Sequence, residues 1–251
     1  MKRAYVIVVV AVVLSLGLAV LAIPSVLANN TQGPKVIDPN SVAYGRTYSE
    51  WSAAWWQWTF SIPVAGHPLF DNGDCNVGQS GPVWFLGGKF CQTGQICTGS
   101  ATRSCSVPAG KALFFPILNV EDSAPEEPAF GCGDSLPPLK GGTIAEMRQC
   151  VEGFLGGIHN LKADVDGKHI YNLKTDFRVR SVEFEVTWPG DNVLNAIGEG
   201  PFAAGTYSPV VDDEIYVMLP PLSPGSHTLH FQGTFSNGFT ENITYNLVVV
   251  K

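Results

Sequence analysis

Acidic side chains are the first candidates for chemistry in this 251-residue chain. A glycosidase uses two carboxyl groups about 5–10 Å apart as its acid and base. Glu121 and Asp122 follow an apolar segment and begin a predicted loop, where functional residues often lie. Glu50 and the acidic run 212–214 are further candidates. The spacing brings no two of these acids together, so solvated loop acids are the alternative interpretation, and Glu50 is also expected to cap a helix.

Tryptophan side chains are the second group of candidates, because indole rings stack on sugars and other ring systems. Four of them occur within eight residues, at Trp51, Trp55, Trp56 and Trp58. All but Trp56 have the helical spacing that is typical of a core-facing stripe. We therefore expect Trp56 to be exposed. Together with Trp84 and Trp188, it is predicted to contact a ligand.

Metal and cofactor signals are weak. Asp71 and Asp74 flank an Asn-Gly pair that suits a calcium ion, with an ordinary Asx turn as the alternative. His227 and His230 are three residues apart on a predicted strand, so they point to opposite faces and form no local metal pair. No Gly-x-Ser-x-Gly nucleophile motif is present. We predict no cofactor other than this calcium ion, and the residues leave open whether the protein is an enzyme.

Six cysteines lie in the middle of the chain, at Cys75, Cys91, Cys97, Cys105, Cys132 and Cys150. An even number of cysteines in an exported protein predicts disulfides. Proximity along the chain suggests the pairs 91–97 and 132–150, which leaves 75 with 105. Zinc is disfavoured because there is no Cys-x-x-Cys pair, and no histidine lies between the first and last cysteine.

The N-terminus has the pattern of a secretory signal. Lys2 and Arg3 precede an apolar run over 4–23, and small residues at 26–28 suit cleavage after Ala28. The run has the length of a membrane span, so an uncleaved anchor is the alternative. We expect a secreted, periplasmic or cell-surface protein, with membrane contact only through this segment if it is uncleaved.

Net charge limits the partners. Removing Lys2 and Arg3 changes the charge from −7 to −9, which disfavours nucleic acid and anionic lipid. An unknown polymer or surface protein is the expected partner.

The remaining chain is predicted to be an extended lead-in over 29–46 and a single β-rich domain over 47–251. Its part at 67–157 is rich in loops and cysteines, and its part at 158–251 is rich in strands. Capping boxes at Thr47 and Thr143 predict helices over 47–60 and 143–155. Apolar or alternating runs predict strands at 83–86, 112–118, 162–165, 168–171, 177–186, 214–219, 227–235 and 241–250. This pattern favours a β-sandwich of immunoglobulin-like or jelly-roll type, with two short helices packed on it.

Three segments resemble a family of exported microbial proteins: YGRTYSEWSAAWWQW at 44–58, GPVWFL at 81–86 and VPAGKALFFPI at 107–117. PGSHTL at 224–229 also fits this family. The resemblance implies one exported domain type and supplies no catalytic residue. The sequence therefore favours a non-catalytic binding or surface-interaction module for a ligand, polymer or protein. The alternative is a carboxylate-dependent hydrolase or lyase acting on extracellular polysaccharide.

Overall fold

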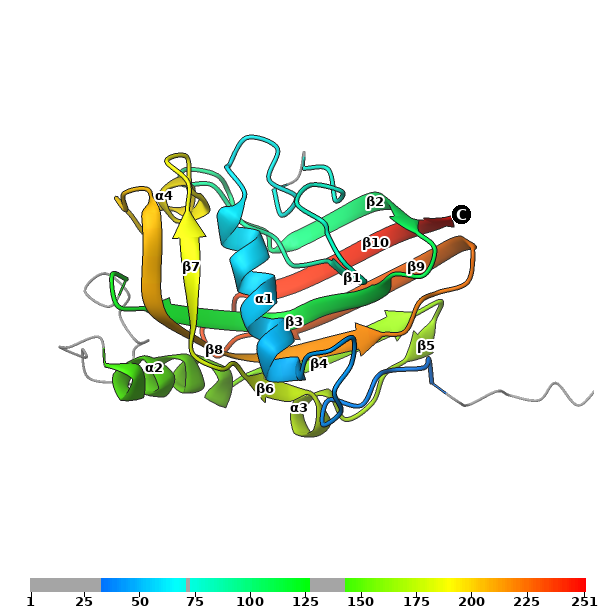
Figure 1. The fold of residues 1–251 in the computed structure, drawn as a ribbon. Helices are drawn as coiled ribbons and strands as arrows, with labels where there is room; N and C mark the ends of the chain where they lie inside the picture. Colours follow the sequence, from blue (N-terminus) through cyan, green and yellow to red (C-terminus); the bar gives the residue numbers. More distant parts are fainter. Residues whose placement is uncertain (1–32, 71–72, 127–142) are drawn as a thin grey trace, which may run out of the picture. The chain divides into compact units, whose positions relative to one another are not determined.

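The part of the chain that the structure describes forms two five-stranded sheets and four short helices (Figure 1). The computed structural model describes residues 33–70, 73–126 and 143–251, which all belong to one compact unit, Gln32–Lys251. The expected signal segment lies outside the described residues. The predicted β-sandwich is confirmed, with the two sheets packed face to face.

The first sheet has the strand order β1-β3-β8-β6, and β7 also pairs with β8. Its strands are β1 (Val83–Phe85), β3 (Ala112–Ser123), β6 (Arg178–Arg180), β7 (Phe184–Trp188) and β8 (Gly205–Leu219). The long strand β8 pairs with β3 along one edge, while β6 and β7 follow each other along its other edge. The second sheet has the order β2-β10-β9-β4-β5. Its strands are β2 (Ser100–Pro108), β4 (His159–Val165), β5 (Lys168–His169), β9 (Gly225–Thr234) and β10 (Thr240–Val250).

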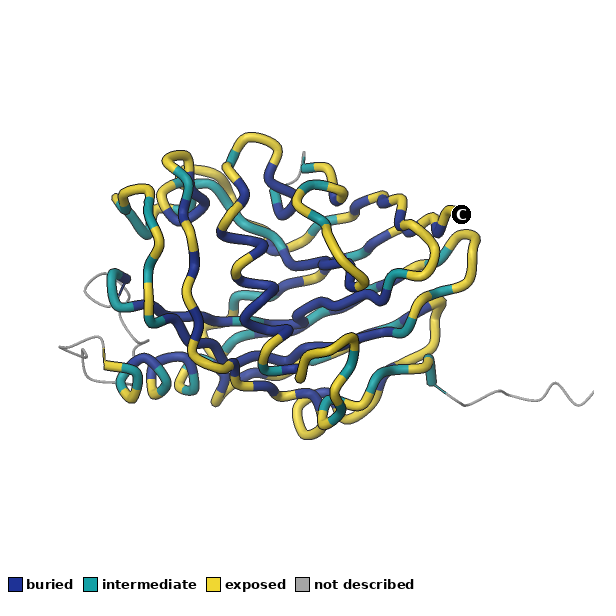
Figure 2. The backbone as a smooth tube through the Cα atoms, viewed as in Figure 1, coloured by how far each residue is buried: buried dark blue, intermediate teal, exposed yellow. Residues whose placement is uncertain are grey.

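The first sheet is buried on both faces, which explains the nearly continuous apolar run of β3. Leu113 and Phe115 of β3 belong to the core between the sheets. Phe114, which points the other way, belongs to a second core beneath α1 (Tyr48–Ser61). Figure 2 shows this arrangement as buried backbone along the central strands and along α1.

The helices begin where the capping boxes predict. Thr47 caps α1 through Glu50, and Thr143 caps α2 (Ile144–Gly156) through Glu146. The short helices α3 (Leu173–Asp176) and α4 (Val193–Ile197) were not predicted. In the parts of the chain that the structure describes, every helix is too short or too polar to cross a membrane.

Several strands match their predictions, and others differ. Asp166 and Gly167 have positive φ angles of 51° and 73°, as a type I′ turn between β4 and β5 requires. The β3–β8 ladder has a register shift between Pro116 and Leu118. The predicted strand over 177–186 is interrupted after β6, and β8 begins nine residues earlier than predicted, at Gly205 rather than Glu214. Strand β2 was not predicted and lies in the part at 67–157 that was expected to be rich in loops.

Two predicted disulfides are confirmed among the described residues. Cys75 pairs with Cys105 at a Cα–Cα distance of 5.9 Å, and Cys91 pairs with Cys97 at 5.4 Å. Cys150 is disulfide-bonded as well, and its expected partner, Cys132, lies outside the described residues. These bonds are typical of proteins in an oxidising compartment.

The bridge between Cys75 and Cys105 is expected to contribute more stability than the bridge between Cys91 and Cys97. It closes a loop of 30 residues rather than 6. By restricting the unfolded chain, the larger loop should stabilise the protein by about 3–4 kcal/mol, compared with about 2 kcal/mol for the smaller loop. Both its cysteines are buried in the core between the sheets. Denaturant unfolding of the two paired Cys→Ala variants would measure the difference. Equal losses of unfolding free energy would contradict this expectation.

Titration of the unreduced, denatured protein with a thiol reagent should detect no free thiol, because all six cysteines are predicted to form disulfides.

Candidate functional site: a carboxylate cluster beside an aromatic cavity

The β3–β8 ladder brings together acidic residues that are far apart in the sequence. Glu121 lies directly opposite Asp212, and Asn119 lies directly opposite Glu214. Because side chains alternate along a strand, these four residues share the sheet face that α1 covers. Glu121, Asp212 and Glu214 are 5%, 0% and 0% exposed. Three of the candidate acids, Glu121, Asp212 and Glu214, therefore converge on one face of the sheet.

Helix α1 supplies hydrogen-bond donors to this acidic face. Ser52 donates its hydroxyl to Asp212, and Trp56, one helical turn later, donates its indole N–H to Glu214. Asp212 also accepts from the backbone N–H of Ser181 at 2.9 Å. On the opposite face of β8, Asp213 is paired with Arg178 at 2.6 Å. The acidic run of β8 thus divides between two different environments.

Burial and mutual repulsion favour the neutral forms of these acids. Burial, followed by the charges of Glu126 and Asp122, raises the pKa of Glu121 well above its ordinary range. Burial and the nearby Asp212 do the same for the pKa of Glu214. Burial raises the pKa values of Asp212 and Glu126 to about 7.

The expectation that Glu121 and Asp122 lie in a solvated loop is wrong. Both belong to the last three residues of β3, and both are buried. The sequence signal for this cluster is a pair of polar residues two positions apart in each strand, at 119 and 121 and at 212 and 214. Sequence reasoning could not use it, because the register of two strands about ninety residues apart comes only from the tertiary structure.

A cavity of about 400 Å³ borders this cluster. We call it the aromatic–carboxylate cavity. Three acids line it, Glu121, Glu199 and Glu241. Its aromatic wall comes from α1, α2, the loop after β1 and the turn between β9 and β10, through Trp56, Phe60, Phe90, Phe154, Phe235 and Phe239. Strand β1 pairs with β3 only as far as Phe114. Residues 119–121 of β3, which lie beyond the end of this pairing, contribute to the cavity lining.

Glu241 is held at the cavity by the loop after β1. Its Oε1 accepts the backbone N–H of Lys89 at 3.2 Å, whereas its Oε2 is buried without a hydrogen-bond partner among the described residues. Gly88 leaves the space for this carboxyl, since a Cβ there would lie 1.9 Å from Oε2. Burial raises the pKa of Glu241 to about 7, although Arg103 lowers it. Burial also raises the pKa of the half-buried Glu199.

Arg103 of β2 fixes the same loop from within the protein. Its guanidinium donates to the carbonyls of Gly87, Gly88 and Leu69 at 2.9–3.2 Å, and to the hydroxyl of Tyr245 at 3.0 Å. Arg103 is 7% exposed. Arg103 therefore ties the cavity loop to β2 and, through Tyr245, to β10.

The predicted ligand-binding tryptophans occupy different places. Trp56 lines the cavity but is only 5% exposed, so the expectation of an exposed Trp56 is wrong. Trp84 belongs to the core between the sheets, and Trp188 packs against Phe60 in the core beneath α1. The Glu50 side chain accepts a hydrogen bond from the Thr47 backbone in the α1 capping box.

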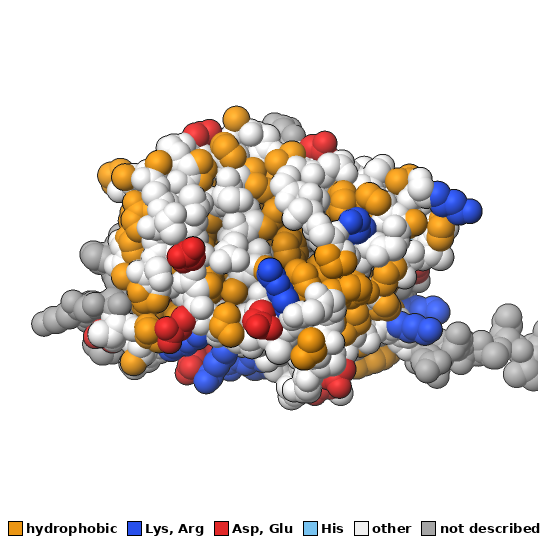
Figure 3. Space-filling model, in the orientation of Figure 1, with side chains coloured by type: hydrophobic (Ala, Val, Ile, Leu, Met, Phe, Trp, Pro, Cys, Tyr) orange, Lys and Arg blue, Asp and Glu red, His pale blue; other side chains and the backbone are white. Residues whose placement is uncertain are grey.

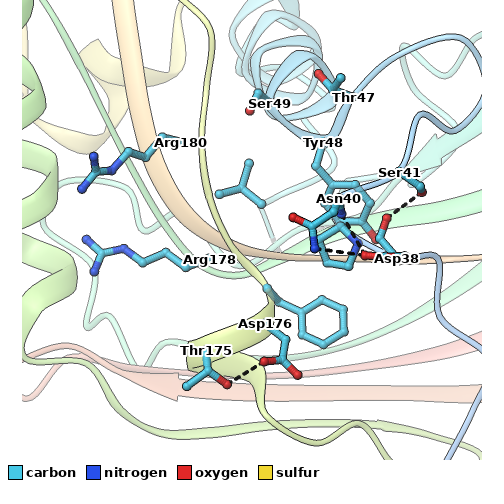
Figure 4. Close-up of a pocket in the computed structure, with 13 residues that line it drawn as sticks. Asp38, Asn40, Ser41, Thr47, Tyr48, Ser49, Thr175, Asp176, Arg178 and Arg180 are labelled. Carbon is cyan, nitrogen blue, oxygen red and sulfur yellow. Dashed lines mark hydrogen bonds between the residues drawn. The ribbon is translucent and has the colours of Figure 1, made fainter.

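A larger depression of about 910 Å³ lies between the lead-in segment, the start of α1 and β6 (Figure 4). Several of its polar groups pair with one another: Asp38 accepts from Asn40, and Thr175 donates to Asp176 at 2.8 Å. In Figure 4 the side chains of Arg178 and Arg180 point away from the Asp38 side. Within the described residues, no buried unpartnered polar atom belongs to its lining. The aromatic–carboxylate cavity is therefore the better candidate site.

The described residues hold no group of three or more histidine, cysteine or acidic side chains arranged for a metal ion. Asp74 accepts from the backbone and side chain of Asn76, as in an Asx turn, and Asp71 lies outside the described residues. His227 and His230 bind different acids, Asp166 and Asp164. On the face shown in Figure 3, acidic and basic side chains are interspersed among uncharged and hydrophobic ones.

Comparison with known proteins gives no family for this chain: no protein-family model matches it, and no curated protein matches it.

Proposed function

We propose that this is an exported, non-catalytic binding protein that takes a small ligand into the aromatic–carboxylate cavity. The observation that carries the proposal is the cavity itself, with an aromatic wall and buried carboxyl groups at one place. Ligand sites are typically apolar hollows with a few polar groups that fix the ligand's orientation. At about 400 Å³, this cavity falls within the usual range of such sites.

Burial of the tryptophans favours a small ligand over a polymer. Stacking on a polysaccharide chain requires an accessible ring face. Trp56, Trp84 and Trp188 are only 5%, 6% and 1% exposed. A compound that enters the cavity can still reach Trp56, because this side chain is part of the lining.

Export is the other part of the proposal. It rests on the signal-like N-terminus and on the disulfides, which suit a secreted, periplasmic or cell-surface location. The resemblance to exported microbial proteins at 44–58, 81–86 and 107–117 supports the same location.

Titration with the neutral fluorescent probe N-phenyl-1-naphthylamine tests the binding site. We expect saturable one-to-one binding to the wild-type protein. Ile197→Trp places a large ring at the half-buried lining of the cavity and should weaken binding at least tenfold. Val42→Trp, at a 70% exposed position outside the lining, should leave binding unchanged. Absence of saturable binding, or equal loss in both variants, would overturn the proposal.

A carboxylate-dependent hydrolase is the second candidate, because Glu121, Glu199 and Glu241 line one cavity. The binding role is favoured because most of the lining is aromatic or aliphatic, and the three acids come from different segments of the wall. Release of reducing sugar from a polysaccharide panel, lost in Glu121→Gln, would favour the hydrolase instead.

A further inference from the structure

We propose that the aromatic–carboxylate cavity selects a small organic cation, an ammonium group carried on an apolar or aromatic body. This inference rests on the proposed binding function and names the ligand class for the same cavity.

The lining residues carry an excess of acidic groups. Glu121, Glu199 and Glu241 face the cavity, whereas Lys89 is the one basic residue among the described lining residues. The ammonium of Lys89 donates to the backbone carbonyl of Ser100 at 3.3 Å. When ionised, the three acids outnumber this single base, so charge complementarity favours a cation over an anion.

Two of the lining acids are almost fully buried and have a carboxyl oxygen without a hydrogen-bond partner among the described residues. Glu121 and Glu241 are 5% and 8% exposed, and Oε2 of each has no hydrogen-bond partner among the described residues. A buried acceptor without a partner costs about 1–3 kcal/mol. An ammonium ligand carries donors for such carboxyl oxygens, whereas a ligand with only acceptor groups carries none.

The aromatic wall favours a cation over other hydrogen-bond donors. Trp56 and Phe60 lie with their ring centroids 5.0 Å apart, and Phe235 and Phe239 form a stacked pair at 6.4 Å. The faces of such rings attract cations, most strongly when water is excluded. Aromatic rings beside carboxylates provide both the apolar contact and the negative potential that an organic ammonium requires.

Protonation links this selectivity to pH. Glu121 lies near Glu126, Asp122 and Asp212, and Glu241 lies near Arg103 and the Lys89 amide. Without a ligand, burial holds protons on these carboxyls, and a bound cation would favour their ionised forms. Cation binding should therefore release protons and become tighter as the pH rises from 5 to 8.

Calorimetric titrations with benzylammonium, benzyl alcohol and benzoate test the ligand class, because these three probes have similar size but different charge. We expect benzylammonium to bind at least tenfold more tightly than benzyl alcohol, and benzoate to bind most weakly. Glu121→Gln combined with Glu241→Gln should remove the tenfold preference for benzylammonium over benzyl alcohol. Glu185→Gln, at an exposed position outside the cavity lining, is the matched control.

A second measurement uses the wild-type protein alone, so it does not depend on the folding of a variant. The benzylammonium affinity should rise at least threefold from pH 5 to pH 8, while that of benzyl alcohol stays constant. Equal affinity for benzylammonium and benzyl alcohol, or no benzylammonium binding at pH 8, would overturn the cation inference. The proposed function would still stand in that case if N-phenyl-1-naphthylamine binds and Ile197→Trp abolishes its binding.

Discussion

Trp55→Ala should cost about 3–5 kcal/mol of unfolding free energy, the usual loss for truncating a buried aromatic residue. Trp55 is 1% exposed, and its ring meets Trp56, Trp58 and Tyr216 edge-on at centroid distances of 5.0–6.2 Å. No small rearrangement fills the space of an indole, because these neighbours are held by contacts of their own.

The indole nitrogen of Trp55 adds a second penalty. It donates to the backbone carbonyl of Leu86 at 2.8 Å, in the segment that leads into the cavity loop. Trp55→Phe retains most of the ring but leaves this carbonyl without its donor, so its cost should be smaller yet above about 1 kcal/mol.

Chemical denaturation of the three proteins measures these differences. Gln57→Ala, at an exposed position of the same helix, is the matched control and should change the free energy of unfolding by less than about 1 kcal/mol. A loss below about 1 kcal/mol for Trp55→Ala would contradict the packing of α1 on the first sheet. If Trp55→Ala lowered ligand affinity but not the free energy of unfolding, Trp55 would belong to the binding site rather than to the core.

Local signals in the sequence were sufficient for the elements that local chemistry determines. The Thr47 and Thr143 capping boxes and the Asp166–Gly167 turn each satisfy their own backbone groups within a few residues. The two confirmed disulfides also join cysteines that proximity along the chain had paired.

Features that depend on tertiary contacts were not predictable. Strand β2 turns Arg103, Cys105 and Val107 inward, and a buried arginine breaks the apolar alternation by which strands are recognised. Trp56 lies off the helical core stripe, but it is buried because cavity residues and β8 cover this side of α1 as well. The convergence of Glu121 with Asp212 depends on strand register, which no short segment specifies.

Stability should fall as the pH rises from 5 to 8. Asp212, Glu126 and Glu241 have folded-state pKa values of about 7, raised by burial from ordinary values near 4. Above pH 4 the unfolded chain loses these protons while the folded protein keeps them. The unfolded state therefore binds fewer protons over this range, and the free energy of unfolding decreases with pH until the folded pKa is passed.

Below pH 6.5, its ordinary pKa, His67 changes the free energy of unfolding in the opposite direction from the buried acids. It is buried against the Thr59 carbonyl, and burial lowers its pKa from 6.5 to about 4, so its neutral form favours the folded state as the pH rises to 6.5. Above pH 6.5 this contribution is constant. The decline between pH 6.5 and pH 8 should therefore be the clearest sign of the buried acids.

Melting temperatures at pH 5, 6.5 and 8, at constant ionic strength, test this expectation. Asp212→Asn keeps the shape of the side chain but removes its titration, and the Ser52 hydroxyl can reverse its hydrogen bond to meet the new amide. Between pH 6.5 and pH 8 the variant should lose less stability than the wild type, by roughly 1 kcal/mol, because its side chain has no proton to release. Glu185→Gln, at an exposed position, should retain the wild-type pH dependence. A melting temperature that rises steadily to pH 8 would show that the acids beneath α1 are ionised in the folded protein.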